Sequence, residues 1–136
     1  MRVFPDTNVL FAALASRGLC ADLLRALLTE HDVVIGVPVE VELRRNLLRK
    51  LRMPPERVEL VLGFLSDLEH APSVPARLPR TPRIDAADAG ILACAAHAKA
   101  DVLVTGDRAL LTLGAHAGMP IVSPRELWMR LRQEQR

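Results

Sequence analysis

The chain has 136 residues, of which 50% are hydrophobic and 25% are charged, and its formal net charge is +2. These values predict one globular domain over residues 1–136 and exclude a largely disordered chain, because the apolar content is too high. No apolar run approaches the ~20 residues that span a bilayer, so no membrane partner is expected. The opening MRVFPDTNVLF breaks its apolar residues with proline and aspartate, unlike a signal peptide. We therefore expect a cytoplasmic protein.

Three features of the composition bear on function classes. The two cysteines have no CxxC spacing and no nearby histidine, which argues against a zinc site or a disulfide framework. Aromatic residues make up only 3% of the chain, which argues against a base-stacking platform for nucleic acid. Sixteen of the 18 basic residues are arginine. Arginine is the better bidentate phosphate ligand, although a GC-rich coding sequence would give the same bias.

Segments typical of strands and helices alternate along the chain. The expected strands are Arg2–Phe4, Val33–Val37, Val102–Thr105 and Ile121–Val122, with at most one more in the proline-rich stretch His70–Arg83. The expected helices follow Asn8, with a break at Gly18, and then cover Ala21–Leu28, Val39–Leu51, Glu56–Leu68, Asp88–Ala98, Arg108–Leu113 and Pro124 to about Gln133. The strands are too apolar to face water on either side. This pattern predicts an α/β fold, a three-layer α/β/α sandwich around a mostly parallel sheet.

Two aspartates come directly after expected strands. Asp6 follows the first strand, and Asp107 follows the strand that ends at Thr105. In open parallel sheets, ligands bind beyond the carboxyl ends of the strands, so both acids are candidate binding or catalytic groups. Each of them is also placed to cap the next helix, and the two roles are compatible.

A glutamate joins them from the helix expected over Val39–Leu51. On a helical projection, the apolar face of this helix contains Leu43, Leu47, Leu48 and Leu51. Glu42 lies on the opposite face, toward solvent or a cleft. A solvated glutamate that pairs with Arg45 three residues later is the alternative interpretation. We also expect this helix to form a hairpin with the next one, because Pro54 and Pro55 separate them.

A fourth acid, Asp88, opens the alanine-rich helix three residues after Asp85. Capping of that helix is the alternative role for both aspartates. No lysine or histidine stands beside the four acids Asp6, Glu42, Asp88 and Asp107. Four carboxylates that converge on one point repel one another unless a cation lies among them. Oxygen-only ligands favour Mg²⁺ or Mn²⁺, the ions used in phosphodiester hydrolysis.

Taken in order, these motifs resemble the PIN-domain family. The matching segments are Val3–Leu10, Val39–Leu43, Asp85–Ala95, Leu103–Leu111 and Ile121–Leu127. The resemblance implies a divalent-metal-dependent endoribonuclease, often the toxin of a toxin–antitoxin pair, with Mg²⁺ or Mn²⁺ as cofactor. The catalytic and metal-binding residues it implies are Asp6, Glu42, Asp88 and Asp107, supported by Asn8, Thr105 and Asp85. Pro5 departs from the family pattern, which usually has there an apolar residue that can donate a hydrogen bond to the sheet.

The resemblance implies RNA as substrate, a cognate antitoxin protein as partner, and a homo-oligomer as a further possibility. Arg45 and Arg49 lie on the helix that carries Glu42, and Arg80 and Arg83 lie in the proline-rich stretch. We expect some of these arginines to contact the RNA backbone, with a solvated helix face as the alternative for the first pair. Trp128 is expected in the core, with an oligomer contact as its alternative.

Other function classes fit the residues less well. A phosphatase of the haloacid-dehalogenase type needs a second aspartate two residues after the first, where this chain has Asn8. A receiver-like signalling domain needs a late lysine after a strand, but Lys99 precedes one. A non-catalytic PIN-like scaffold or RNA-binding module is the remaining alternative. It predicts that the acidic quartet is broken, and all four positions carry acids.

Overall fold

A computed structural model describes residues 1–76 and 84–134. The strands are β1 (Arg2–Pro5), β2 (Asp32–Gly36), β3 (Glu69–Ala71), β4 (Val102–Val104), β5 (Ala115–His116) and β6 (Met119–Val122). The helices are α1 (Thr7–Ala15), α2 (Leu19–Glu30), α3 (Val37–Arg49), α4 (Pro55–Gly63), α5 (Ala86–His97), α6 (Arg108–Leu113) and α7 (Pro124–Glu134). Arg80 and Arg83 lie outside the described residues.

The described strands form one sheet in the order β3-β2-β1-β4-β6-β5. All neighbours are parallel except β5 and β6, which form an antiparallel pair. The chain moves outward from β1 to β3 and then returns to the other side of β1, where it forms β4. The order of the strands therefore reverses between β1 and β4. In open α/β sheets, such a switch point is where a cleft opens beyond the carboxyl ends of the strands.

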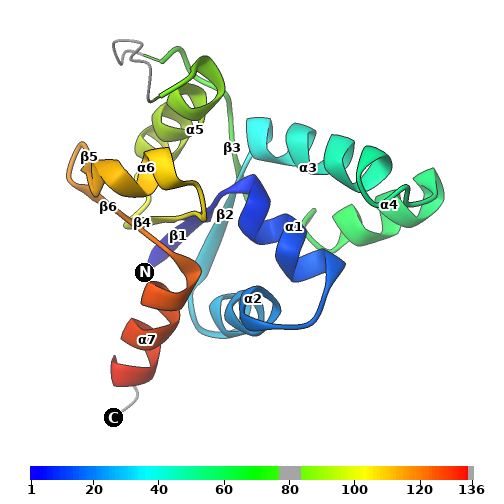
Figure 1. Ribbon diagram of the computed structural model, residues 1–136, viewed down its shortest axis with the longest axis horizontal. Helices are drawn as coiled ribbons and strands as arrows, with labels where there is room; N and C mark the ends of the chain where they lie inside the picture. Colours follow the sequence, from blue (N-terminus) through cyan, green and yellow to red (C-terminus); the bar gives the residue numbers. More distant parts are fainter. Residues whose placement is uncertain (77–83, 135–136) are drawn as a thin grey trace.

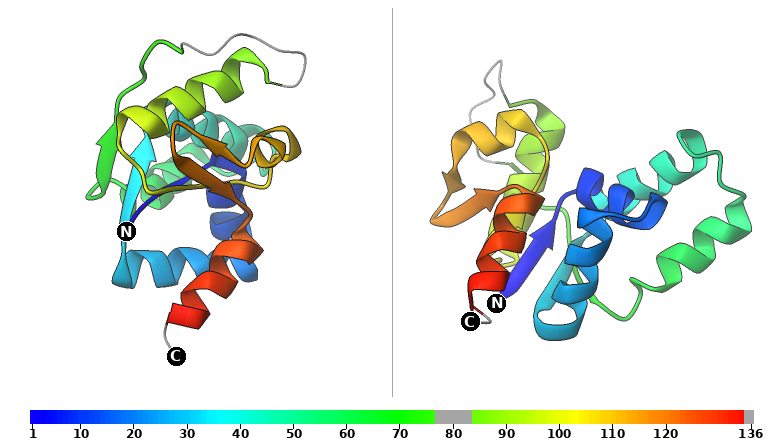
Figure 2. Two further views of the ribbon diagram at one scale, coloured as in Figure 1. Left: turned by 90° about the vertical axis from the view of Figure 1, so that its left-hand side faces the viewer. Right: turned by 60° about the horizontal axis from the view of Figure 1, so that its bottom comes forward.

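The helices cover both faces of the sheet, as the three-layer prediction requires (Figures 1 and 2). Right-handed crossovers put α1 to α4 on one face, because these helices connect strands that step in one direction. Helices α5 and α6 connect strands that step in the other direction and so lie on the opposite face. α7 contacts α2. Figure 1 shows α3 and α4 as the expected helical hairpin, which extends away from α5 and α6.

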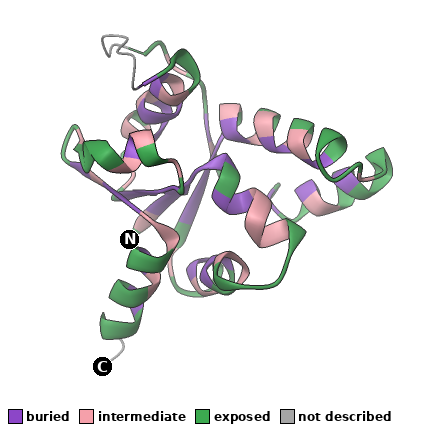
Figure 3. Cartoon of the chain, viewed as in Figure 1, coloured by how far each residue is buried: buried purple, intermediate pink, exposed green. Residues whose placement is uncertain are grey.

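The core lies where the strands meet these helices (Figure 3). Val3 and Phe4 of the central strand β1 are fully buried, as are Leu43 and Leu47 of α3. At the end of β2, a Cβ added to Gly36 would lie 2.5 Å from the Phe4 ring. Only glycine fits at this contact, so α3 begins directly against the core. That close approach places the first turns of α3 beside the carboxyl end of β1.

Several boundaries differ from the sequence expectation. The antiparallel strand β5 was not expected, because its two residues carry no periodic signal. Helix α4 ends at Gly63 rather than Leu68, since residues 64–67 turn. Leu48 and Leu51 were expected on the buried face of α3, but they are exposed at the tip of the hairpin, beyond the reach of the core. Pro5 does not shorten β1 and pairs with Val104.

Two further expectations can be compared with the structure. Trp128 is partly buried against the core, and the guanidinium of Arg132 lies 5.9 Å from the centre of its ring. Within residues 1–76 and 84–134, no helix combines the length and the apolar character that a bilayer crossing requires.

Candidate functional site

Asp6 and Asp107 lie on either side of the switch point between β1 and β4. Asp6 is buried, with 8% of its surface exposed, and its carboxylate accepts two hydrogen bonds. The backbone N–H of Thr7 donates to Oδ1 at 2.7 Å, and the Thr105 hydroxyl donates to Oδ2 at 2.6 Å. Asp107 is half-buried, and its Oδ1 accepts from the backbone N–H of Leu110 at 3.1 Å. Both acids therefore cap helices, as the alternative interpretation held, and both also face the cleft edge of the sheet.

Thr105 connects these two acids. Its side chain is completely buried, and its hydroxyl donates to Asp6 while accepting the backbone N–H of Asp107 at 3.0 Å. This pattern fixes the direction of the hydroxyl proton. Asn8 supports the same turn from α1, because its Oδ1 accepts the backbone N–H of Gly106 at 3.2 Å. The end of β1 is therefore bound to the turn after β4 by side chains as well as by the sheet.

Glu42 reaches this region from α3. Its carboxylate is half-buried, and Oε2 lies 3.2 Å from the hydroxyl of Thr7, which is buried at the start of α1. The alternative ion pair with Arg45 does not form, and Arg45 is exposed. The sequence analysis gave Thr7 no role. The available signal was its position, a hydroxyl residue directly after a strand-end acid.

Asp85 and Asp88 have different roles at the start of α5. Asp85 is exposed and accepts the backbone N–H of Asp88 at 2.8 Å, so Asp85 is the helix cap. The Asp88 carboxylate is half-buried in the first turn and makes no hydrogen bond with the described residues. Capping therefore accounts for Asp85 and leaves the carboxylate of Asp88 without a structural partner.

The charges of these acids act on one another. Burial, together with the negative charges of Asp107, Asp85, Asp6 and Glu42, raises the pKa of Asp88 to about 6. Burial is also the main cause that raises the pKa of Asp6, with smaller contributions from Glu42 and Asp107 that the hydrogen bonds from Thr105 and Thr7 oppose. We call Asp6, Glu42, Asp88 and Asp107 the carboxylate cluster.

Among the described residues, the positive charge that offsets the carboxylate cluster comes from helix N-termini. Helices α1, α5 and α6 all begin at it, and the N-terminus of a helix carries a partial positive charge. Within the described ranges, no arginine, lysine or histidine forms an ion pair with any of the four acids. The cluster is thus a concentration of negative charge that the protein itself neutralises only in part.

The donor set fits a hard divalent cation. Its atoms are carboxylate oxygens, which favour Mg²⁺ and Mn²⁺ over softer metals. Neighbouring carboxylates add to the effect of burial in raising the pKa values of Asp6 and Asp88, and a cation would relieve that repulsion. Within residues 1–76 and 84–134, however, no three His, Cys, Asp or Glu side chains are already arranged to hold a metal ion.

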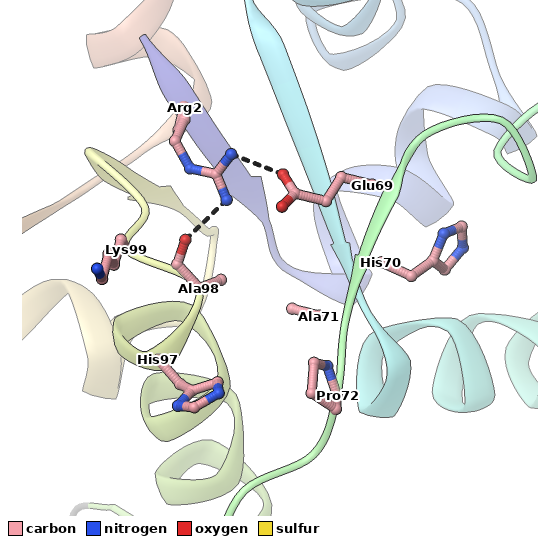
Figure 4. A pocket seen from close by; sticks show the side chains of 8 residues that line it. All are labelled: Arg2, Glu69, His70, Ala71, Pro72, His97, Ala98 and Lys99. Atoms are coloured by element: carbon pink, nitrogen blue, oxygen red, sulfur yellow. Dashed lines mark hydrogen bonds and ion pairs between the residues drawn. The ribbon is translucent and has the colours of Figure 1, made fainter.

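A hollow lies at the opposite edge of the sheet, where β1 and β3 begin (Figure 4). It has a volume of about 390 Å³ and is lined by residues that include His97 and Lys99. The side chain of Arg2 crosses it, 2.6 Å from a carboxylate oxygen of Glu69 and 2.7 Å from the carbonyl of Ala98. Unlike the carboxylate cluster, this hollow contains acidic and basic groups that neutralise each other.

Comparison with known proteins identifies the family. A family profile described as "PIN domain" matches residues 2–109, which is more than half of the chain. The chain belongs to the PIN-domain family. The match includes all four acids of the carboxylate cluster, whereas β5, β6 and α7 lie beyond it.

A solved structure gives the PIN-domain fold independent support. It is the crystal structure of VapBC2 from Rickettsia felis bound to a DNA fragment from their promoter. The TM-score is 0.66 and the sequence identity 19%, and the alignment covers 90% of this chain and 98% of that one. At this identity, the likeness establishes the fold alone. No curated protein sequence matches this PIN domain.

Proposed function

We propose that this PIN domain is an endoribonuclease that requires Mg²⁺ or Mn²⁺ and hydrolyses phosphodiester bonds in RNA. The observation that carries the proposal is the carboxylate cluster, in which four acids at the switch point repel one another without a neutralising side chain. Such a cluster lowers the stability of the free protein. A bound cation would relieve the repulsion between the carboxylates, and this relief would favour its binding. An acidic cluster of this kind therefore suits metal-dependent phosphodiester chemistry.

Each residue of the site has a proposed part. Asp6, Glu42, Asp88 and Asp107 would hold the ion. Bound there, Mg²⁺ or Mn²⁺ would activate a water molecule and stabilise the charge that develops on the phosphate.

The supporting residues hold the acids in place. Thr105 and Asn8 hold the end of β1 against the turn after β4, and Thr105 keeps Asp6 oriented through its 2.6 Å hydrogen bond. Asp85 positions Asp88 because it caps the helix that carries it.

The RNA would approach across the basic surface of α3. Arg45 and Arg49 are exposed on the helix that carries Glu42, and neither forms an ion pair with the described residues. Free guanidinium groups beside a metal site suit phosphate contacts that carry no sequence information. Arg80 and Arg83 are proposed for the same role from the sequence alone.

We further propose that the protein is the toxin of a toxin–antitoxin pair. The likeness in fold to VapBC2 supports a cognate antitoxin as its protein partner. Residues 1–136 would act as one domain, since β6, beyond the matched segment, pairs with β4 in the same sheet. A homo-oligomer is also part of the proposal. Expression of the protein alone should arrest bacterial growth, and an Asp6→Asn variant should not.

The direct test is RNA cleavage by the purified protein. Wild type should cleave single-stranded RNA in Mg²⁺ or Mn²⁺, and EDTA should abolish cleavage. Asp6→Asn and Asp107→Asn should each lose most activity while keeping a cooperative melting transition, because both substitutions preserve size and remove a metal-binding charge. Undiminished cleavage by both folded variants would mean that the activity comes from a contaminant or from another site.

A non-catalytic RNA-binding scaffold is the second candidate. It is favoured by one observation, that the described side chains form no ready-made metal site. This candidate predicts RNA binding that does not change with EDTA and no cleavage at any metal concentration. Electrophoretic mobility shifts and cleavage measured on the same samples separate the two functions.

A further inference from the structure

We propose that Thr7 is a positioning residue that holds Glu42 in the carboxylate cluster and sets its separation from Asp6. The inference rests on the proposed metal-dependent function and extends it to a residue outside the four acids. It follows from how differently the four acids are supported.

Three of the acids are placed by the backbone that carries them. Asp6 directly follows β1, Asp107 lies three residues beyond the end of β4, and both cap helices, while Asp88 lies in the first turn of α5. Glu42 lies instead in the second turn of α3, on a long side chain that is half-buried. Its only hydrogen bond within the described residues comes from Thr7. Without that bond, nothing described would direct its carboxylate toward the other acids.

Thr7 is suited to this task because it offers donors to two acids at once. Its backbone N–H donates to Asp6 at 2.7 Å, and its hydroxyl donates to Glu42 at 3.2 Å. The residue is 3% exposed, so water cannot readily replace either contact. Two donors placed between two like-charged carboxylates oppose the repulsion between them.

The position of Thr7 in α1 keeps its hydroxyl available. Within a helix, a threonine hydroxyl usually bonds the carbonyl of the preceding turn. Thr7 is the first residue of α1, so no preceding helical turn exists and the hydroxyl points to α3 instead. Contacts between α1 and α3 hold the two helices together around this bond. The arrangement makes the first turn of α1 a bridge from β1 to Glu42.

The test uses Thr7→Val, which keeps the shape and removes the hydroxyl, and Thr7→Ser, which restores the hydroxyl. The matched control is Thr29→Val, because Thr29 is exposed on α2 and its hydroxyl bonds only the carbonyl of Arg25. Binding of Mn²⁺ is measured by calorimetry on each folded protein, and melting temperatures are recorded with and without Mn²⁺. Neither readout requires RNA or turnover.

Thr7→Val should weaken Mn²⁺ binding by about 10-fold, the lower end of what the loss of a group that orients a metal ligand costs. Its melting temperature without metal should fall modestly, because the hydroxyl no longer opposes the repulsion between Asp6 and Glu42. Its stabilisation by Mn²⁺ should shrink as well. Thr7→Ser should restore most of the affinity, and Thr29→Val should not alter it. In a Glu42→Ala background, Thr7→Val should have little further effect, because Thr7 acts through Glu42.

Two results would overturn the inference. One is a folded Thr7→Val protein that binds Mn²⁺ as tightly as wild type does. The other is a loss of Mn²⁺ affinity on Thr7→Val that is as large in the Glu42→Ala background as in the wild-type background. If Thr7→Val does not fold, Thr7→Ala in the same pair of backgrounds gives the same comparison. Failure of wild type itself to bind Mn²⁺ would instead refute the proposed function, so the two failures are distinguishable.

Discussion

The sheet has one edge where the parallel strands begin and another, the carboxyl edge, where they end. The two edges differ in whether their charged side chains are paired. Where β1 begins, Arg2 pairs with Glu69, and its backbone N–H donates to the Asp101 carboxylate at 2.6 Å. Those contacts connect β1 to the start of β3 and to the turn before β4. At the carboxyl edge, the acids of the carboxylate cluster repel one another and have no cationic partner among the described residues.

The difference separates charges that support the fold from charges that reduce its stability. At the first edge, the Arg2 guanidinium lowers the pKa of Glu69, because the pair favours the ionised carboxylate. At the second edge, burial and neighbouring acids raise the pKa of Asp88 to about 6. Helix capping accounts for Asp6 and Asp107 one at a time, but it does not account for four neighbouring acids without a cationic partner among the described residues. Their position at the switch point is the one that the proposed metal-dependent function predicts.

The largest expected effect is on catalysis by Asp88→Asn. The substitution should lower RNA cleavage by about 100-fold, since it removes one charge from a site that acts electrostatically. The same variant should melt at a higher temperature than wild type in EDTA, because Asp88 makes no hydrogen bond that the asparagine would lose and the repulsion is relieved. A fall in both RNA cleavage and the melting temperature in EDTA would mean that Asp88 supports the fold. The carboxyl edge would then not differ from the paired edge in the way described.

Addition of Mn²⁺ should have the next largest effect. A ligand at 100 times its Kd stabilises the folded state by about 2.7 kcal/mol, which corresponds to a shift of several degrees for a domain of this size. The shift should shrink in Asp6→Asn and nearly vanish when Asp107→Asn is added. Sodium chloride at matched ionic strength is the control for general screening. An equal shift with that salt would argue against a metal site at the carboxyl edge.

Acidification should affect the two edges with opposite signs. Asp88 binds its proton more tightly in the folded state, so its contribution to the free energy of unfolding is greatest at low pH and is lost as pH rises through about 6. Lowering the pH from 7 to 5 in EDTA should therefore add stability, on the order of 1 kcal/mol after screening at this partly exposed group. Urea unfolding measures the effect, and Asp88→Asn should remove most of it.

The paired edge should respond only at lower pH. The pKa of Glu69 is lowered from 4.5 in the folded state, so the stability from its ion pair is present above 4.5 and is lost as pH falls below that value. Between pH 7 and pH 5 the Arg2–Glu69 pair therefore does not contribute, and the difference between wild type and Asp88→Asn isolates the carboxylate cluster. Stability that falls over this interval would contradict the sign derived for Asp88 and Asp6.

The smallest effect is expected from Arg2→Met. The substitution removes the contacts of the guanidinium with Glu69 and Ala98 and should lower the melting temperature modestly, because exposed ion pairs contribute little. RNA cleavage per folded molecule should not change. Arg25→Met is the matched control, since it removes an exposed pair with Asp22 that lies within one helix. Reduced cleavage by folded Arg2→Met would show that the two edges are coupled.

The sequence predicted the sheet and the edge at which the acids gather, because strand-end acids and apolar strands depend on local pattern. It did not predict the exposure of Leu48 and Leu51, because helical periodicity identifies an apolar face but not how far the core extends along it.

It also gave no role to Thr7, whose partner lies 35 residues away. Such a contact depends on how α1 packs against α3, which no local pattern encodes. The roles of the four acids, and of Asn8, Thr105 and Asp85, remain predictions that the experiments above address.

The central position of β1 has a consequence for synthesis of the chain. Asp6 is made almost first, but the hydroxyl that orients it belongs to a residue 99 positions later, and β1 gains its second neighbour only when β4 exists. A ribosome that has made the first three strands has therefore made only two of the four acids and only the β1 side of the switch point. For an enzyme that would cleave RNA, this order of assembly keeps the nascent chain inactive beside the message that encodes it until translation has passed residue 107.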